Sequence, residues 1–140
     1  MIHLIKLCVG VSSVQQLEDH RAGRIMSGLS RPDDLNLHRT RMMPKRRDEI
    51  LEGGSLYWVI AGSIQCRQKI VELEPQTDHE GKSCCDIWMD PEIIRTIPQP
   101  KRPFQGWRYF QHNDAPSDIN VGADEGEVEL AAELTKLGLI

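Results

Sequence analysis

The sequence predicts an α+β fold with a largely antiparallel sheet, and three observations support this class. A run of about twenty residues with strong β propensity, SLYWVIAGSIQCRQKIVELE, is interrupted near its middle by Gly62 and Ser63. In all, about five to seven segments have the composition of strands. The helical segments are set apart from most of these strands, so helices and strands do not alternate as they do in a parallel α/β fold.

The chain begins with a strand and a helix. HLIKLCVGV, residues 3–11, is rich in β-branched and leucine residues and predicts a central strand. Residues 12–26 predict a helix capped by Ser12 or Ser13. Its apolar residues recur near the helical period at Val14, Leu17, Ala22 and Ile25. Residues 27–36, with their glycine, proline and aspartates, predict a loop.

A basic segment follows this loop. LHRTRMM, residues 37–43, alternates and predicts a strand, and Pro44 then opens a short helix that ends at Gly53 or Gly54. From residue 36 to residue 47 the chain has no acid and five basic residues, Arg39, Arg41, Lys45, Arg46 and Arg47. Cations in the first turn of a helix oppose its dipole, whereas arginines beside helix-terminal amides suit a phosphate. The segment therefore predicts an anion-binding turn, and an ordinary solvated face is the alternative.

The long β run predicts a hairpin of two strands, Leu56–Ala61 and Ser63–Leu73. QTDHEGKS, residues 76–83, predicts a turn or loop. CCDIWMD, residues 84–90, predicts another strand, which the following proline stops. PEIIRTI, residues 91–97, fits either a helical turn or a last strand.

The next stretch, PQPKRPFQGWRYF, combines proline, aromatic rings and cations. It holds three of the eight prolines and four of the seven Phe, Trp and Tyr residues. Because proline fixes φ, we expect an extended strap. Rings such as Trp107 suit stacking on bases, and Arg102 and Arg108 suit phosphates. The alternative to a binding segment is a structural one, in which the strap crosses the core and the rings of Phe104 and Trp107 are buried beneath it.

The C-terminal segment is acidic. From Asp114 to Ile140 there are seven acids and one lysine, whereas the whole chain carries a net charge of -4, so the rest of the chain is positive. Residues 126–140, GEVELAAELTKLGLI, have helical periodicity. We expect a single α+β domain over residues 1–119, with an acidic C-terminal helix in 120–140 packed on it or extending from it.

Composition excludes several classes of protein. No apolar run approaches the ~20 residues of a membrane helix, and Lys6 interrupts the first apolar stretch, which disfavours a signal peptide. We therefore expect a cytoplasmic protein without a membrane partner. The four cysteines predict reduced, mostly buried thiols. The sequence has no P-loop, G-x-G-x-x-G, G-x-S-x-G or H-E-x-x-H motif, so we expect no cofactor and no metal site.

Several stretches resemble known families. MIHLIKLCVGV, TRMMPKR with GGSLYWVIAGSIQCRQKI, and DPEIIRTIPQPKRPFQGWRYF with DAP resemble an uncharacterised alphaproteobacterial family, the domain of unknown function 1489, over residues 1 to about 119. That resemblance implies no activity. More distantly, the succession of 41–52, 54–59 and 64–73 resembles the PUA-like superfamily, with its ASCH and EVE domains, although Ser55 stands where such domains often carry Asp. This resemblance implies a small, partly closed β-barrel with flanking helices, and RNA or modified-nucleotide binding between the basic turn and the barrel mouth.

We therefore expect a nucleic-acid-binding or nucleotide-binding module with RNA or a nucleotide as partner. Its candidate binding residues are Arg39, Arg41, Lys45, Arg46, Arg47, Arg102, Trp107 and Arg108. One alternative is a small enzyme for an anionic or phosphorylated substrate, with His38 or His79 as acid or base. Another is a protein-interaction adaptor that docks through the strap. The sequence does not predict an oligomeric state.

Overall fold

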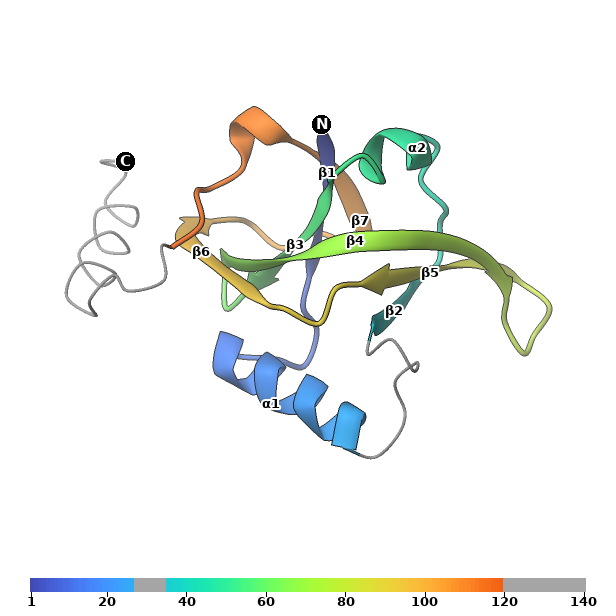
Figure 1. The fold of residues 1–140 in the computed structure, drawn as a ribbon, viewed down its shortest axis with the longest axis horizontal. Helices are drawn as coiled ribbons and strands as arrows, with labels where there is room; N and C mark the ends of the chain where they lie inside the picture. Colours follow the sequence, from blue (N-terminus) through green and yellow to red (C-terminus); the bar gives the residue numbers. More distant parts are fainter. Residues whose placement is uncertain (27–34, 120–140) are drawn as a thin grey trace.

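The structure, a computed structural model, describes residues 1–26 and 35–119 (Figure 1). The predicted C-terminal helix and most of the predicted loop at 27–36 lie outside the described residues. The described elements are β1 (Ile2–Leu7), α1 (Val14–Met26), β2 (Asn36–Thr40), α2 (Arg47–Ile50), β3 (Ser55–Ile60), β4 (Ser63–Thr77), β5 (Ser83–Met89), β6 (Ile94–Pro100), β7 (Trp107–Gln111) and the 3-10 turn η1 (His112–Asp114). Neither helix in this part of the chain has the length and apolar character needed to cross a membrane.

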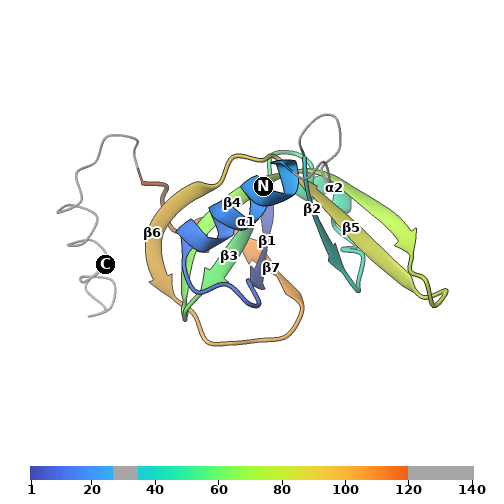
Figure 2. The same ribbon diagram turned by 90° about the horizontal axis from the view of Figure 1, so that it is seen from below.

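The seven strands form one mostly antiparallel sheet, which confirms the predicted α+β class. Their order is β2-β5-β4-β3-β1-β7, and β6 also pairs with β4. The pairing of β1 with β3 is parallel, and the other pairings are antiparallel. The N-terminal strand is central, as predicted, because β3 and β7 flank it. Figure 2 shows β2 and β5 running away at an angle from β1, β3 and β7.

The sheet is not closed into a barrel, so this part of the expected architecture is wrong. Within the described residues β2 and β7 are the two ends of the strand order and do not pair. The chain leaves β2 after Thr40, and Pro44 follows shortly with no backbone N–H to donate to a ladder. A side chain makes the link instead, because the indole of Trp107 in β7 donates to the carbonyl oxygen of Met42 at 2.8 Å.

Alternation along the strands separates two apolar clusters on opposite faces of the sheet. In β1, Ile2 and Leu4 belong to the larger cluster, which α1 and α2 cover with Val14, Leu17 and Ile50. Ile5 belongs to the smaller cluster on the other face, which includes Tyr57, Val59, Ile64 and Phe110. Each face of the sheet therefore has its own buried layer, and each carries a cavity described below.

The predicted hairpin is confirmed as β3 and β4, joined by Ala61 and Gly62. Both turn residues have positive φ, 50° and 82°, which is typical of the type I′ turns that suit right-handed strand twist. β4 continues past the predicted end to Thr77, because its second half pairs with β5. Residues Ile94–Pro100 form β6, so the last strand is the correct alternative for PEIIRTI and the helical turn is wrong.

The helix predicted from Pro44 is only one turn long. α2 begins at Arg47, and Asp48 and Glu49 lie in its first turn, where acids suit the dipole. Lys45 and Arg46 precede the helix, so the expectation that they occupy its first turn is wrong. Such a short helix has too small a dipole to hold an anion by itself. Anion binding here would have to come from side chains.

Candidate functional site

The two segments singled out in the sequence meet in space. Trp107 in β7 donates its indole N–H to the carbonyl oxygen of Met42 at 2.8 Å, and the backbone N–H of Arg46 donates to the hydroxyl oxygen of Tyr109 at 3.1 Å. The Arg46 guanidinium lies 5.6 Å from the centre of the Tyr109 ring, and the two aromatic rings meet edge to face at 4.9 Å. We call Met42, Arg46, Trp107 and Tyr109 the aromatic junction, which Lys45 adjoins in the chain.

Three of the predicted phosphate-binding arginines are hydrogen-bonded to carboxylates, and Arg47 lies 3.8 Å from the carboxylate of Asp48. Arg39 binds Asp86 with two hydrogen bonds of 2.6 and 3.0 Å, as the β2–β5 register places the two residues opposite each other. The hydrogen bond and the charge of Asp86 raise the pKa of Arg39. Arg41 donates to Asp78 at 2.8 Å. This bond, with two backbone N–H groups, lowers the pKa of the Asp78 carboxyl.

The third of these arginines, Arg46, pairs with Glu49 at 2.6 Å, three residues along the chain. Their hydrogen bond raises the pKa of Arg46 and lowers that of Glu49. Arg47 donates to the carbonyl oxygen of Leu73 at 2.8 Å and so ties α2 to β4. The basic segment therefore carries less free positive charge than its composition indicates. Within the described residues Lys45 has no ion pair and is exposed.

The strap divides between the two faces of the sheet. It leaves β6, crosses the β3–β4 turn where the N–H of Lys101 donates to the carbonyl oxygen of Gly62, and enters β7. Trp107 is half-buried against the larger apolar cluster, and Phe104 packs on the smaller one. Arg108 lies over the Phe104 ring at 5.2 Å, and Arg102 is exposed in the connecting loop. Arg108 therefore faces away from the junction, whereas Trp107 belongs to it.

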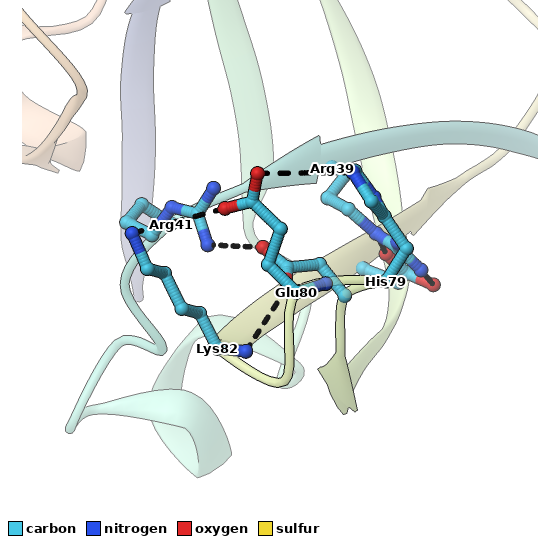
Figure 3. Close-up of polar contacts among 7 residues, drawn as sticks. Arg39, Arg41, His79, Glu80 and Lys82 are labelled. Carbon is cyan, nitrogen blue, oxygen red and sulfur yellow. Dashed lines mark hydrogen bonds and ion pairs between the residues drawn. The ribbon is translucent and has the colours of Figure 1, made fainter.

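The tip of the β4–β5 hairpin is a separate polar cluster. Figure 3 shows Arg41, His79, Glu80 and Lys82 gathered there. His79 and Lys82 lie 3.9 and 3.8 Å from carboxylate oxygens of Glu80. The His79 side chain is 91% exposed, so it lacks the enclosed setting that a catalytic imidazole needs. Among the described residues no group of three His, Cys, Asp or Glu side chains is placed to hold a metal ion.

A cavity of about 660 Å³ lies between the end of β1, α1 and β2. We call it the β1–β2 cavity. Its polar lining includes Lys6, His20, His38 and Arg39, and its floor includes Trp58. His38 meets Trp58 edge to face, with ring centres 5.1 Å apart. Arg39 is already paired with Asp86, but Lys6 has no ion pair among the described residues, and no aspartate or glutamate among them lines the cavity. The wall therefore favours an anion at Lys6.

Lys6 joins the cavity to the aromatic junction. In the β1–β7 register Lys6 stands opposite Trp107, so the two side chains are neighbours on one face of the sheet. Lys6 is half-buried, and this burial lowers its pKa. Lys6 is not among the binding residues predicted from the sequence. The signal was present, because Lys6 is the one charged residue in an apolar central strand and shares a face with Leu4 and Cys8.

The cysteines agree with the sequence prediction. All four are free thiols, and Cys66, Cys84 and Cys85 are buried. Burial raises the pKa of Cys66 to about 12 and that of Cys85 to about 11. Such thiols stay protonated at neutral pH and are poor nucleophiles. Cys8, which lines the β1–β2 cavity, is the partly exposed one.

Comparison with known protein families gives a match. A family model described as "Protein of unknown function (DUF1489)" matches residues 4–140. Neither curated proteins nor solved structures give a match.

Proposed function

The chain belongs to the family of the protein of unknown function DUF1489, and we propose that it is a module that binds nucleic acid or a nucleotide. The ligand would lie on the face of the sheet that carries the β1–β2 cavity and the aromatic junction. The observation that carries this proposal is Lys6, which lines the cavity without an ion pair among the described residues, in a wall where no described residue is an aspartate or glutamate. The distant resemblance to PUA-like domains points to the same class of ligand. We also propose a cytoplasmic setting, in which the four thiols stay reduced.

The chemistry of this face suits a phosphorylated ring compound. The cavity volume of about 660 Å³ lies in the range of small-molecule sites. Lys6 offers a charge at the cavity, and Lys45 offers one beside the junction. Tyr109, 36% exposed, presents a ring on which a base can stack. Phosphates would therefore meet the two lysines, with a base in the cavity or on the ring.

Fluorescence anisotropy with labelled single- and double-stranded RNA and DNA, at low and at physiological salt, tests this proposal. We expect affinity for at least one of these probes to fall as salt rises, because each neutralised phosphate releases counterions. A competition series with unlabelled mononucleotides then distinguishes two kinds of site. Mononucleotides that displace the labelled probe indicate a nucleotide site, and a lack of displacement indicates a site for the polymer. If none of the probes binds at low salt, the proposal is wrong.

Two substitutions locate the binding surface. Lys6→Met keeps the apolar stem and removes the charge at the cavity, and Lys45→Glu reverses an exposed charge beside the junction. We expect each to weaken binding and to lower the slope of log affinity against log salt by roughly 0.7 per lost contact on a single strand. Lys69→Glu is the matched control, because Lys69 is exposed on β4 outside the cavity and the junction. Equal losses for Lys45→Glu and Lys69→Glu would contradict this surface.

An enzyme acting on an anionic or phosphorylated substrate is the second candidate, and one observation favours it. His38 lines the β1–β2 cavity, where an imidazole would be within reach of a bound substrate. A panel of phosphate esters would test it by measuring product formation. Turnover that His38→Gln removes, with ligand binding retained, would establish the enzyme. Binding without turnover favours the module.

A further inference from the structure

A second cavity, of about 300 Å³, lies on the opposite face of the sheet. It is bounded by η1 and the residues after it, by β3 and by β4, and we call it the η1 cavity. Its polar lining comprises His3, Tyr57, Arg67, His112, Ser117 and Asp118. Neither the proposed nucleic-acid surface nor its test involves these residues.

A chain of hydrogen bonds fixes the protonation of the two imidazoles in this cavity. The backbone N–H of Ser55 donates to Nδ1 of His3 at 2.9 Å, so the proton of a neutral His3 must be on Nε2. Nε2 of His3 lies 2.9 Å from Nδ1 of His112 and therefore donates to it. His112 in turn must carry its own proton on Nε2. His112 thus presents a neutral N–H donor at the cavity.

The buried environment keeps His3 neutral. His3 is only 2% exposed, and burial, with a smaller contribution from the positive charge of Arg67, lowers its pKa to about 4. A proton added to His3 would have to go on Nδ1, which faces the Ser55 N–H. The chain from Ser55 through His3 to His112 therefore exists only with both rings neutral.

Tyr57 contributes a hydroxyl group without a partner. Its side chain is 3% exposed, lines the cavity and has no hydrogen bond among the described residues. Burial raises the pKa of this phenol. In the β3–β4 register Tyr57 stands opposite Arg67, so the two side chains are neighbours on one face of the sheet. The hydroxyl oxygen is not itself fully buried, so it is open to the cavity and can donate a hydrogen bond to a ligand acceptor.

Arg67 supplies further hydrogen-bond donors, and its charge is balanced by that of Asp118. Its Nε and Nη2 donate to Asp118 at 2.8 and 2.7 Å, and its Nη1 donates to the hydroxyl of Ser55 at 2.8 Å. The pair with Arg67 lowers the pKa of Asp118 and keeps it ionised. These bonds leave N–H groups on both terminal nitrogens for another acceptor. Asp118 is occupied by Arg67 and therefore repels an incoming anion less than a free carboxylate would.

We propose that the η1 cavity is a second ligand site, which binds the oxyanion group of a small molecule through Tyr57, His112 and Arg67. The three side chains come from β3, η1 and β4, and all of them offer hydrogen-bond donors. Donors from several elements that line one cavity select an acceptor such as a carboxylate or a phosphate monoester. The small volume limits the ligand to a compact molecule.

The first test uses inorganic phosphate and acetate as separate probes, with chloride at equal ionic strength as the reference. Long-range ¹H–¹⁵N NMR at neutral pH follows the imidazole nitrogens of the full chain. We expect His3 and His112 to be neutral with the proton on Nε2, and a saturable shift of the His112 Nε2 signal with one or both probes. A shift with phosphate alone would indicate that the natural ligand is a phosphate ester, and a shift with acetate alone would indicate a carboxylate. No saturable shift beyond that of chloride, or a proton on Nδ1 of His112, would overturn the proposal.

The second test uses variants that keep the fold. Tyr57→Phe preserves the ring and removes only the hydroxyl, and we expect it to weaken binding of the responsive probe about tenfold. His112→Ala removes an exposed side chain and should weaken it similarly, whereas His79→Ala at the hairpin tip is the matched control and should not. Unchanged affinity in Tyr57→Phe would overturn the site. Because the Lys45→Glu and Lys6→Met assays probe the other face, either proposal can fail alone.

Discussion

The indole N–H of Trp58 donates to Oε1 of Gln68 at 3.0 Å in the interior of the sheet. The amide nitrogen of Gln68 in turn donates to Oδ1 of Asn36 at 2.8 Å and to the carbonyl oxygen of Asp90 at 3.0 Å. Trp58, Gln68 and Asn36 are all buried. A single amide thus joins β2, β3 and β4, and it holds the tryptophan that forms the floor of the β1–β2 cavity.

Gln68→Leu should destabilise the protein strongly. It keeps the approximate size of the side chain but leaves the Trp58 N–H and the Asn36 carbonyl without their partner. We expect the free energy of unfolding to fall by roughly 2–4 kcal/mol, as measured by urea denaturation. The exposed Gln105→Leu is the control and should stay within about 0.5 kcal/mol of the wild type. Similar values for both variants would show that the buried amide contributes little.

The β3–β4 turn offers a stabilising substitution. Ala61 has φ of 50°, in the left-handed region that alanine adopts at a cost and asparagine tolerates. We expect Ala61→Asn, which creates the Asn-Gly pair of type I′ turns, to raise the free energy of unfolding by about 0.5–1 kcal/mol. Ala115→Asn is the comparison, because Ala115 has φ of −77° and should gain nothing. A loss of stability in Ala61→Asn would contradict the assigned turn.

Stability should depend on pH through His3. Its folded pKa of about 4 lies below the ordinary value of 6.5, so between these values the unfolded chain binds a proton that the folded chain does not. We expect the free energy of unfolding to fall by roughly 2–3 kcal/mol as pH drops from 6.5 to 4. His3→Gln should flatten this dependence, and the exposed His79→Gln should preserve it. Parallel pH profiles in both variants would assign the effect to other groups.

Gly54 lies where the chain turns from α2 into β3, and its position has no room for a side chain. A Cβ atom there would overlap the carbonyl oxygens of Ile2 and Ile50, both of them backbone atoms. We expect Gly54→Ala to lower the free energy of unfolding by more than about 2 kcal/mol. Gly10 also has a left-handed backbone, with φ of 80°, but a Cβ atom there would meet no other atom within 4 Å. Gly10→Ala therefore introduces backbone strain without steric overlap and should lower the free energy of unfolding by about 1–2 kcal/mol. A milder effect at Gly54 than at Gly10 would contradict this packing.

Two aromatic residues of the strap lie on opposite faces of the sheet, so substituting each of them tests which face binds RNA. Tyr109 belongs to the aromatic junction, whereas Phe104 packs on the opposite face. If bases stack at the junction, Tyr109→Leu should weaken binding of single-stranded RNA by about five- to a hundredfold. Phe104→Leu removes a similar ring from the same segment and should leave affinity unchanged. Equal effects in the anisotropy assay would indicate a general disturbance of the strap.

The elements that the sequence predicts correctly are those with a local signal. The hairpin of β3 and β4 follows from β propensity and a glycine break, and the central position of β1 follows from its apolar composition. α2 begins later than predicted, at Arg47, because the residues before it are tied to β7: the Met42 carbonyl oxygen accepts from Trp107, and the Arg46 N–H donates to Tyr109. The local pattern around Pro44 contains no information about this tertiary limit.

The candidate site was only partly predictable, because its contacts join distant residues. Asp86 lies 47 residues after Arg39, and their pairing depends on the β2–β5 register, which no single strand encodes. The charge of the basic segment was therefore visible in the sequence, but its partial neutralisation was not. His3 and His112, 109 residues apart, are an even clearer case, since neither belongs to a recognisable motif.

The long strand β4 passes through both parts of the sheet. Its first half pairs with β3 and β6, and its second half pairs with β5, which carries β2. We therefore expect the strands on both sides of β4 to unfold in one cooperative step. Amide hydrogens of β5 and β3 should then exchange with solvent at similarly slow rates, and a chain cut within β4 should lose both parts of the sheet together.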